Sequence, residues 1–383
     1  MSTHTDMTEI TDADVRLLVD LVSTPSVSGS ERAAAARFVA HAAERGFTAE
    51  IDEAGNACAH RGPTDADLHI VMLGHIDTVP GEIPVRIAGG VLHGRGSVDA
   101  KGPLCAMLCA AQRAELPDNV RLSVIGAVGE ESAGSPGARS VMGQLNPDAC
   151  IIGEPSGWDG VTLGYKGRLL ATATASCPNH HSAGEHASAG DEVVTWWTAV
   201  VEHVNTFNAE RNGAFEMIQA TIQDMRYRGD GLTQAASLET GFRLPIGLHP
   251  DDFARTIQSL AVDNVTVECS GHEPAHATDR NDPIVRAVAS AIRAAGGRPR
   301  PKRKTGTADF NVVGPVWNCP IAAYGPGDSS LDHTPFECLE LEEYACSIGV
   351  LANAVTMLAG ELACAIRNPT STPHARSAVG RVD

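Results

Sequence analysis

The stretch Leu68-His-Ile-Val-Met-Leu-Gly-His-Ile-Asp-Thr-Val-Pro80 decides how the rest of the chain is interpreted. Its unbroken apolar run, Ile70 to Leu73, is typical of a parallel strand buried on both faces. The strand ends at Gly74 and brings His75 and Asp77 to its carboxyl end, where open α/β sheets bind ligands. Because they lie two residues apart on an extended chain, both side chains leave the same face. The pair can supply a metal ligand and the acid that orients it, although such a pair more often forms a surface hydrogen bond.

Length and composition narrow the class of protein. The 383 residues suffice for a large core and two domains, and 43% hydrophobic with 20% charged residues is an ordinary globular composition. The net charge of −18 argues against general nucleic-acid binding. We find no amino-terminal signal region and no apolar run of membrane-spanning length, so we expect a cytoplasmic protein without membrane association. The ten cysteines occur without a CxxC pair, which predicts reduced core cysteines, neither a disulfide frame nor a thiolate metal site.

Two patterns succeed one another along the chain. Residues 1–163 alternate strands with helices, which indicates an α/β domain with a mainly parallel sheet and helices on both faces. Residues 164–275 change to small and β-branched runs of period two with two helices, the order of an inserted α+β sandwich. The first domain resumes over 276–383, and its last part, 368–383, is rich in Pro, Ser, Thr and Arg and is expected to be disordered.

The periodicities also predict individual elements. The expected helices lie near 11–25, 30–46, 102–115, 137–143, 191–207, 251–260, 283–295 and 341–362. The expected strands lie near 47–51, 68–73, 120–128, 148–152, 161–175, 217–222, 240–244, 265–270 and 321–324.

Further acidic and histidine side chains follow the ends of these strands. Asp99 lies in the glycine-rich loop before the helix over 102–115, and Glu130 with Glu131 follows the strand over 120–128. Glu154 ends the next strand, and His333 lies in a long loop. Taken singly, Asp99 can be a helix cap, the two glutamates a solvated acidic turn and His333 a loop residue without function. Adjacent buried carboxylates, however, are costly unless a cation or a proton compensates them.

Together these residues predict a metal centre. His75, Asp99, Glu131, Glu154 and His333 supply two imidazoles and three carboxylates at one edge of one sheet. That set suits two divalent ions that share a bridging aspartate. Paired ions of this kind can turn a water held between them into a nucleophile near neutral pH. The remaining carboxylate, Glu130, is then free to take the proton of that water and pass it to a leaving amine.

At this point the chain resembles the M20 metallopeptidases, a family that includes carboxypeptidase, succinyl-diaminopimelate desuccinylase and acetylornithine deacetylase. Five blocks in family order carry the resemblance, and they are Gly74-His-Ile-Asp77, Gly94-Arg-Gly-Ser-Val-Asp-Ala-Lys-Gly102, Gly129-Glu-Glu131, Gly153-Glu-Pro155 and His333-Thr-Pro335. The resemblance implies a zinc-peptidase-like fold in which His75, Asp99 and Glu154 bind one zinc ion. A second zinc ion would be held by Asp99, Glu131 and His333, and cobalt or manganese could replace zinc. Glu130 would be the general base and Asp77 the orienting acid, while Ala100 departs from the asparagine of many relatives.

The inserted domain fits the same resemblance, because family members use it as a lid and for dimerisation. His181 matches a lid histidine that reaches the partner's active site and stabilises the oxyanion, with His180 as its rival. Arg243 matches an arginine that holds the substrate carboxylate, although a structural salt bridge is the alternative. Gly306 and Thr307 resemble a loop whose backbone lines the substrate pocket.

Within the family, the chain is most similar to hydrolases that release lysine or ornithine from an amino-group carrier protein. These enzymes cut the amide at the γ-carboxyl of the carrier's C-terminal glutamate. The matching stretches are 164–168, 305–311 and 326–335. The basic run Arg298-Pro-Arg-Pro-Lys-Arg-Lys304 supports an acidic partner independently. We expect Lys302, Arg303 and Lys304 to steer the carrier to the pocket, and a solvated loop before a strand is the alternative.

Two competing functions share these residues. A small-molecule deacylase or dipeptidase would use the same metal ions without needing a basic mouth. A catalytically dead member kept as a binding protein is the other, and the presence of Glu130 and of every ligand argues against it.

Overall fold

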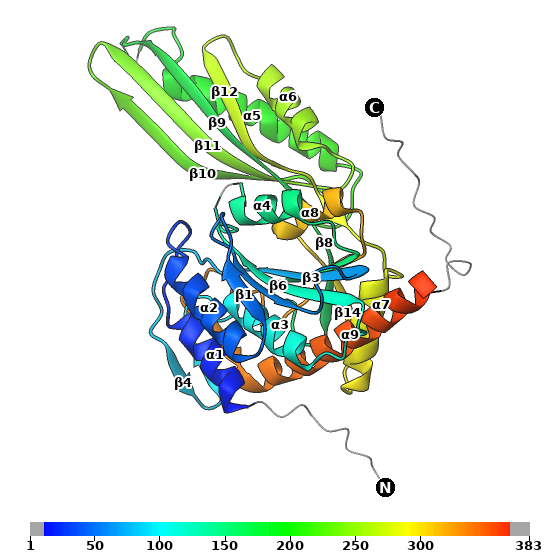
Figure 1. Ribbon diagram of the computed structural model, residues 1–383. Helices are drawn as coiled ribbons and strands as arrows, with labels where there is room; N and C mark the ends of the chain where they lie inside the picture. The colour runs from blue at the N-terminus through cyan, green and yellow to red at the C-terminus, as the bar shows by residue number, and fades with distance from the viewer. Residues whose placement is uncertain (1–10, 133, 182, 368–383) are drawn as a thin grey trace.

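The computed structural model describes residues 11–132, 134–181 and 183–367. They form a large α/β unit and a smaller sheet-and-helix unit, which lies at the top of Figure 1. The strands of the large unit are β1 (Thr48–Ile51), β2 (Ala57–Arg61), β3 (Leu68–His75), β6 (Val120–Ala127), β7 (Ala149–Gly153), β8 (Gly160–Tyr165), β13 (His276–Ala277), β14 (Arg300–Lys304) and β15 (Ile321–Ala323). They form one sheet in the order β1-β2-β6-β3-β7-β15-β8-β13, with β14 also paired to β8.

The centre of this sheet is parallel and is covered on both faces. β6, β3, β7 and β15 run parallel, whereas β1 and β2 at one edge and β8 and β13 at the other add antiparallel pairs. Ile70 and Met72 of β3 belong to one core cluster, and Val71 and Leu73 to another on the opposite face. The apolar run from Ile70 to Leu73 is therefore part of a strand that is buried on both faces, as predicted.

Two different sets of helices cover the two faces of the sheet (Figure 1). One face carries α1 (Asp12–Val22), α2 (Arg32–Glu44), α3 (Lys101–Arg113), α7 (Pro283–Ala294) and α9 (Leu341–Arg367). The other face carries α4 (Pro136–Gln144) and α8 (Asp309–Trp317). A capping box begins the first helix, because Thr11 and Asp14 bond each other reciprocally.

A row of glycines lets the central helix α3 approach the sheet closely. Gly126, Gly74 and Gly153 are register neighbours on β6, β3 and β7. A Cβ at Gly126 would lie 2.9 Å from Leu104 Cδ2, and one at Gly153 would lie 2.8 Å from Met107 Sδ. Because α3 begins two residues after Asp99, this close packing places the Asp99 loop over the carboxyl ends of the parallel strands.

The smaller unit is a four-stranded antiparallel sheet in the order β10-β11-β9-β12, with two helices packed on it (Figure 1). Its elements are β9 (Gly167–Pro178), α5 (Ala189–Asn208), β10 (Gln219–Gly229), β11 (Thr233–Leu244), α6 (Pro250–Ser259) and β12 (Val265–Glu273). It has a core of its own, in which Trp196 donates its indole N–H to the carbonyl of Ile257 at 2.8 Å. The α/β fold with a sheet-rich insert is therefore confirmed.

The strand expected over 161–175 is two strands in different sheets. β8 belongs to the large sheet and β9 to the small one, and only Lys166 separates them. Residue 164, the expected start of the insert, thus lies within β8. The period-two pattern runs through both strands, so it contains no signal for the change of sheet.

Other elements escape the sequence patterns. β4 (Arg86–Ala88), β5 (Val91–His93) and β16 (Cys338–Glu340) form a small sheet of three-residue strands, too short for a period to show. Most of the basic run over 298–304, for which a solvated loop was the alternative, is β14, which pairs with β8 through its backbone. α8, missed by the patterns, contains Pro315. The tail over 368–383 lies outside the described residues.

α9 is longer and more apolar than expected. Within the described residues, Leu341–Ile366 is the one helical stretch long and apolar enough to cross a bilayer, with a mean hydropathy of 1.6 in its 18-residue window. In that window 56% of the residues are buried inside the protein, where α9 packs against α3 and α7. This burial is the pattern of a core helix.

Candidate metal centre and active site

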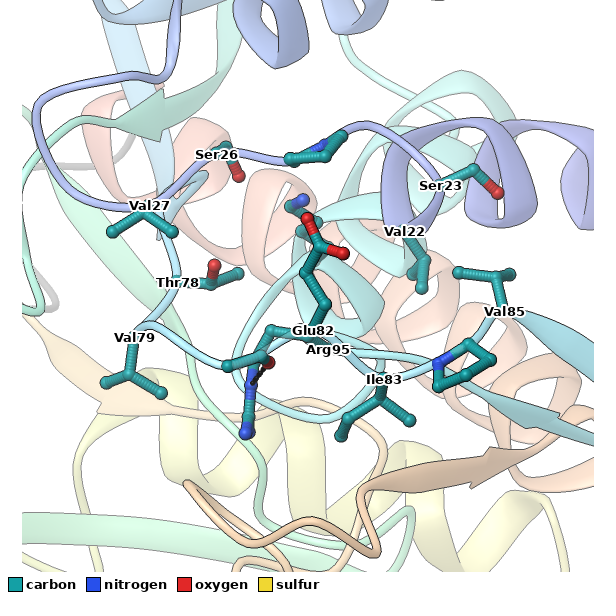
Figure 2. Close-up of a pocket in the computed structure, with 14 residues that line it drawn as sticks. Val22, Ser23, Ser26, Val27, Thr78, Val79, Glu82, Ile83, Val85 and Arg95 are labelled. Carbon is teal, nitrogen blue, oxygen red and sulfur yellow. Dashed lines mark hydrogen bonds between the residues drawn. The ribbon is translucent and has the colours of Figure 1, made fainter.

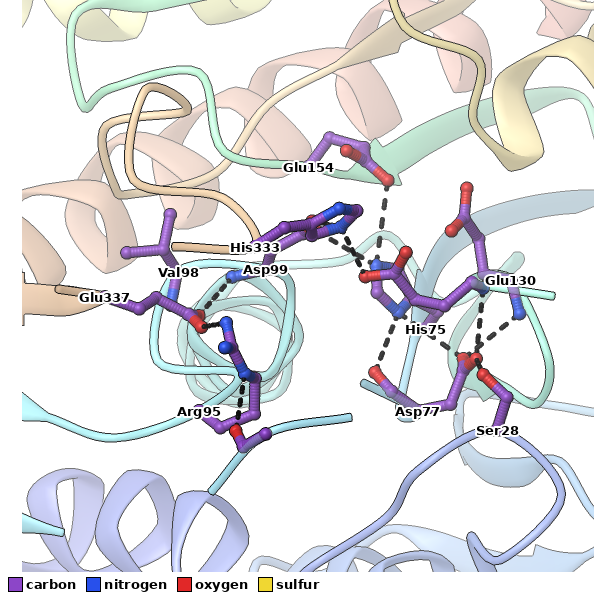
Figure 3. Close-up of polar contacts among 12 residues, drawn as sticks. Ser28, His75, Asp77, Arg95, Val98, Asp99, Glu130, Glu154, His333 and Glu337 are labelled. Atoms are coloured by element: carbon purple, nitrogen blue, oxygen red, sulfur yellow. Dashed lines mark hydrogen bonds and ion pairs between the residues drawn. The ribbon is translucent and has the colours of Figure 1, made fainter. Parts of the chain in front are cut away.

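Asp99 lies between two histidines that come from distant parts of the chain (Figure 3). Its Oδ1 is 3.2 Å from His75 Nε2, and its Oδ2 is 3.1 Å from His333 Nε2. His75 Nε2 also lies 3.9 Å from Glu154 Oε1, and His333 Nε2 lies 3.0 Å from Glu131 Oε1. One carboxylate is therefore shared by two groups of potential ligands.

These two groups correspond to the two predicted ion sites. The ligand atoms of His75, Asp99 and Glu154 all lie within 4.8 Å of one another, as do those of Asp99, Glu131 and His333. A third set of the same compactness joins His75 to Glu130 and Glu131. Imidazole nitrogen and carboxylate oxygen are the donors that zinc and similar divalent ions accept. The structure thus shows a site of several residues that fits metal binding.

The electrostatics of the cluster also fit bound cations. Burial, followed by the charge of Asp99, raises the pKa of Glu154 to about 8. Burial likewise raises the pKa of Glu130 and of Glu131. Carboxylates shift in this way when they crowd one another out of water, and a cation between them would reverse the shift.

Contacts with carboxylates raise the pKa of both histidines of the cluster. Hydrogen bonds to Asp99 and Glu131 raise the pKa of His333 to about 10. Burial acts to lower the pKa of His75, but its hydrogen bonds to Asp77 and Asp99 outweigh burial and raise it. Metal binding would displace protons from the two histidines, because a ligating imidazole must be neutral.

Asp77 connects the first histidine to the acidic pair. His75 Nδ1 lies 3.1 Å from the carbonyl oxygen of Asp77 and 3.5 Å from its Oδ1. The same carboxylate accepts the backbone N–H groups of Glu130 and Glu131 at 3.1 and 3.0 Å, and the hydroxyl of Ser28 at 2.7 Å. Ser28 has no recognisable sequence signal, because it lies in an irregular segment 49 residues from its partner.

Comparisons with known proteins give the family of the chain. Residues 71–357 match the family described as Peptidase family M20/M25/M40. The chain belongs to this family. It is 47% identical to the LysW-lysine hydrolase of Deinococcus radiodurans, over 92% of this chain and 100% of the relative. It is 39% identical to a putative LysW-lysine/LysW-ornithine hydrolase of Thermococcus kodakarensis, over 90% of this chain and 92% of that one.

A solved M20 structure has the same fold. The M20 family metallo-carboxypeptidase Sso-CP2 from Sulfolobus solfataricus superposes with a TM-score of 0.76 at 18% identity, over 91% of this chain and 100% of the other. The predicted family is confirmed, and this M20 protein is a metal-dependent hydrolase of amide bonds.

The predicted substrate residues Arg243 and Thr307 meet beside the cluster. Arg243 Nη1 donates to Thr307 Oγ1 at 2.7 Å, and that hydroxyl donates to the carbonyl of Lys166 at 2.9 Å. Burial, and then the charge of Arg168, lowers the pKa of Arg243, while Glu130 acts in the opposite direction. Arg243 is therefore within electrostatic reach of the predicted general base. A Cβ at Gly306 would meet no atom within 4 Å, so this residue faces open space.

The lid histidines of this M20 chain lie far from its own cluster. His180 is half-buried and His181 is exposed, and both follow β9, whose opposite end, Gly167, adjoins the large sheet. Among the described residues, the contacts of His181 are local, and its Nδ1 accepts the Ala183 N–H at 3.1 Å. Its reach into a partner's site therefore stays a prediction.

The three basic residues of β14 point in different directions. Lys302 donates its ammonium to the carbonyl of Ser156 at 2.6 Å. Arg303 is exposed, with its guanidinium 5.0 Å from the ring centre of Phe215. Lys304 lies over Tyr165, 5.8 Å from its ring centre, and its charge lowers the pKa of Glu154 against the larger effect of burial. The run is thus not one uniform basic surface.

A cavity of about 440 Å³ lies near the site but excludes the predicted ligands (Figure 2). Its wall includes Val22, Val27, Val79, Ile83, Val85 and Arg95. The segment 78–85 that forms much of this wall directly follows Asp77. The predicted metal centre is distinct from this largely apolar cavity.

Proposed function

We propose that the protein is a di-metal amidohydrolase that releases lysine, ornithine or a related diamino acid from a carrier protein. The bond cut would be the amide at the γ-carboxyl of the C-terminal glutamate of an acidic amino-group carrier. The observation that carries the chemistry is the position of Asp99 between His75 and His333, with Glu130 beside them. The names of the relatives from Deinococcus and Thermococcus support the carrier as substrate.

Two divalent ions, zinc with cobalt or manganese as alternatives, are proposed for the cluster. His75, Asp99 and Glu154 would hold one ion, and Asp99, Glu131 and His333 the other. When bound, such paired ions supply Lewis acidity that polarises the amide and lowers the pKa of water.

The side chains around the ions are proposed to move the protons and hold the substrate. Glu130 would take a proton from the attacking water and deliver it to the leaving amine. Asp77 would keep His75 oriented through the contacts on Nδ1. Arg243, with Thr307 and the open face of Gly306, would hold the carboxylate of the released amino acid. His181 of a second copy would donate to the oxyanion that forms on the amide carbonyl.

The carrier is proposed to dock at β14. Arg303 is exposed, and the half-buried Lys304 lies over Tyr165 within electrostatic reach of Glu154, so these two can meet acidic groups of the carrier. Lys302 contributes less freely, because its ammonium is already bonded to Ser156.

A homodimer through the lid and a cytoplasmic location complete the proposal. β10 is the edge strand of the small sheet and exposes Ile222, Met225 and Tyr227. An exposed apolar edge strand is a ready surface for a second chain.

The decisive experiment compares kcat/KM for three substrates: a carrier-linked lysine, an acetylated ornithine and a dipeptide. The proposal expects the carrier-linked lysine to be preferred by at least about 10²-fold. Glu130→Gln should lower the rate by about 10²–10⁴-fold without loss of the metals, because only the proton acceptor is removed. Its control is Glu340→Gln, at the exposed last residue of β16.

A small-molecule deacylase is the second candidate, and the bonded ammonium of Lys302 favours it because that bond weakens the case for a basic mouth. Equal or higher kcat/KM for acetylated ornithine, unchanged by Arg303→Met, would establish this alternative and overturn the carrier proposal.

A further inference from the structure

Glu337 is a buried carboxylate that joins two separate parts of the metal centre. Its side chain is fully buried and lies four residues after His333. Glu337 Oε1 accepts the backbone N–H groups of Val98 and Asp99, at 2.9 and 3.1 Å (Figure 3). Its Oε2 accepts Arg95 Nη1 at 2.8 Å. All three donors come from the loop that carries Asp99.

Arg95 anchors this carboxylate from the opposite side. Its guanidinium donates through Nε to the carbonyl of Gly81 at 3.0 Å, and its side chain is 14% exposed. The carbonyl of Glu337 also accepts the Gly94 N–H at 3.4 Å. Glu337 is thus paired with a guanidinium and fully hydrogen-bonded, which is the arrangement that makes a buried carboxyl group tolerable.

The contacts of Glu337 bear on the distance between two predicted ligands, Asp99 and His333. Asp99 reaches both halves of the cluster, whereas His333 belongs to one half and sits on a loop rather than on a strand. Through Glu337, the backbone of Asp99 is tied to the segment that follows His333. If these hydrogen bonds to Glu337 shifted, the separation of Asp99 and His333 would change, while His75 and Glu154 would keep their places at the ends of their strands.

We propose that Glu337 is a positioning residue for the ion held by Asp99, Glu131 and His333. This inference rests on the proposed di-metal function. Glu337 sets the spacing of that half of the site through the two amides that it accepts. The half formed by His75, Asp99 and Glu154 depends much less on it.

The test measures stepwise cobalt binding to chelator-treated full-length protein, by competition titration and by the visible absorption of bound cobalt. Glu337→Ala removes the acceptor, and Glu337→Asp withdraws it by one methylene. Each should weaken binding of the ion held by Asp99, Glu131 and His333 by about 10–100-fold, the usual effect of outer ligand partners, and affect the other ion much less. Glu337→Gln keeps an oxygen for the two amides and should restore most of that affinity.

Two comparisons make the result decisive. His333→Ala removes the same half directly, so the spectrum of the remaining cobalt should match that of Glu337→Ala. Glu340→Ala, three residues away and exposed, should bind cobalt as the unmodified protein does. If Glu337→Ala fails to fold, the pair Glu337→Asp and Glu337→Gln decides in the same way.

Equal weakening of both ions, or a lower unfolding temperature of the metal-free protein with both affinities unchanged, would overturn the proposal. No substrate enters these measurements. Failure of the carrier hypothesis would therefore show only in the kcat/KM comparison, and failure of the Glu337 role only in the cobalt titration.

Discussion

The two halves of the metal centre differ in what holds them. His75 and Glu154 come at the ends of β3 and β7 in the parallel core, and their side chains are 2% and 9% exposed. His333 comes from a loop, its side chain is 52% exposed, and its φ of +60° is uncommon for a residue with a side chain. The comparison teaches that the sheet itself builds one half, whereas loop contacts must build the other.

The largest effect is expected from removing the residue that both halves share. Asp99→Ala should prevent tight binding of either ion and lower kcat/KM by about 10⁴-fold or more, because both ligand sets lose their shared member. Elemental analysis after dialysis gives the metal content, and amide hydrolysis gives the rate. Asp65→Ala, a change at an exposed aspartate, is the control. Full metal content in the Asp99 variant would refute the shared-ligand geometry.

The second prediction separates the halves. His333→Ala should leave one ion per chain and reduce kcat/KM by about 10²–10³-fold, because the strand-borne half stays intact. His75→Ala should lose the ion of the strand-borne half, which is held more tightly, and should lose more activity than His333→Ala. Stoichiometry from elemental analysis decides, with the exposed His272→Ala as control. The interpretation would be wrong if the two variants lost the same ion to the same extent.

The third prediction concerns how the metal affinity of each half depends on pH. Glu154, with its pKa raised to about 8 by burial and Asp99, must lose its proton before it can bind a cation. His333, with its pKa raised to about 10 by Asp99 and Glu131, must do the same. Protons therefore compete with the metal below these values, and affinity should rise with pH by about tenfold per unit for each proton displaced.

The two halves should differ in how steeply affinity rises above pH 8. The half with Glu154 should gain affinity less steeply there, because only the proton of His75 is still displaced, and the half with His333 should continue to gain affinity toward pH 10. Competition titrations at several pH values, with proton release measured in buffers of different ionisation enthalpy, test this. Affinities that do not change between pH 6 and 8 would contradict it.

The sequence predicts the strand-borne half well for a physical reason. Parallel strands end at one edge of a sheet, so a polar residue directly after a buried run is placed by the run itself. His75, Glu131 and Glu154 follow such runs, and the structure brings them together with Asp99. His333 was predicted less directly, because a long loop after a strand does not fix the position of its residues.

Contacts between loops could not be predicted. Ser28 donates to Asp77, and Glu337 accepts backbone N–H groups of the Asp99 loop. Each contact joins residues far apart in the sequence, and no local periodicity indicates such a contact. β14 was missed because strand pairing uses the backbone, whereas its sequence of Arg, Lys and Pro is polar. The role of His181 stays a prediction, since it depends on a second chain.

The short joints around the inserted unit have a further consequence. One joint is Lys166 alone, whose ammonium is held by the carbonyls of Ala214 and Met217. The other joint is the pair of residues between Glu273 and His276, at the edge of the large sheet. Residues 167–273 thus enter and leave as a self-contained module with its own core, and chimaeras that exchange it between relatives would need only these two splice points.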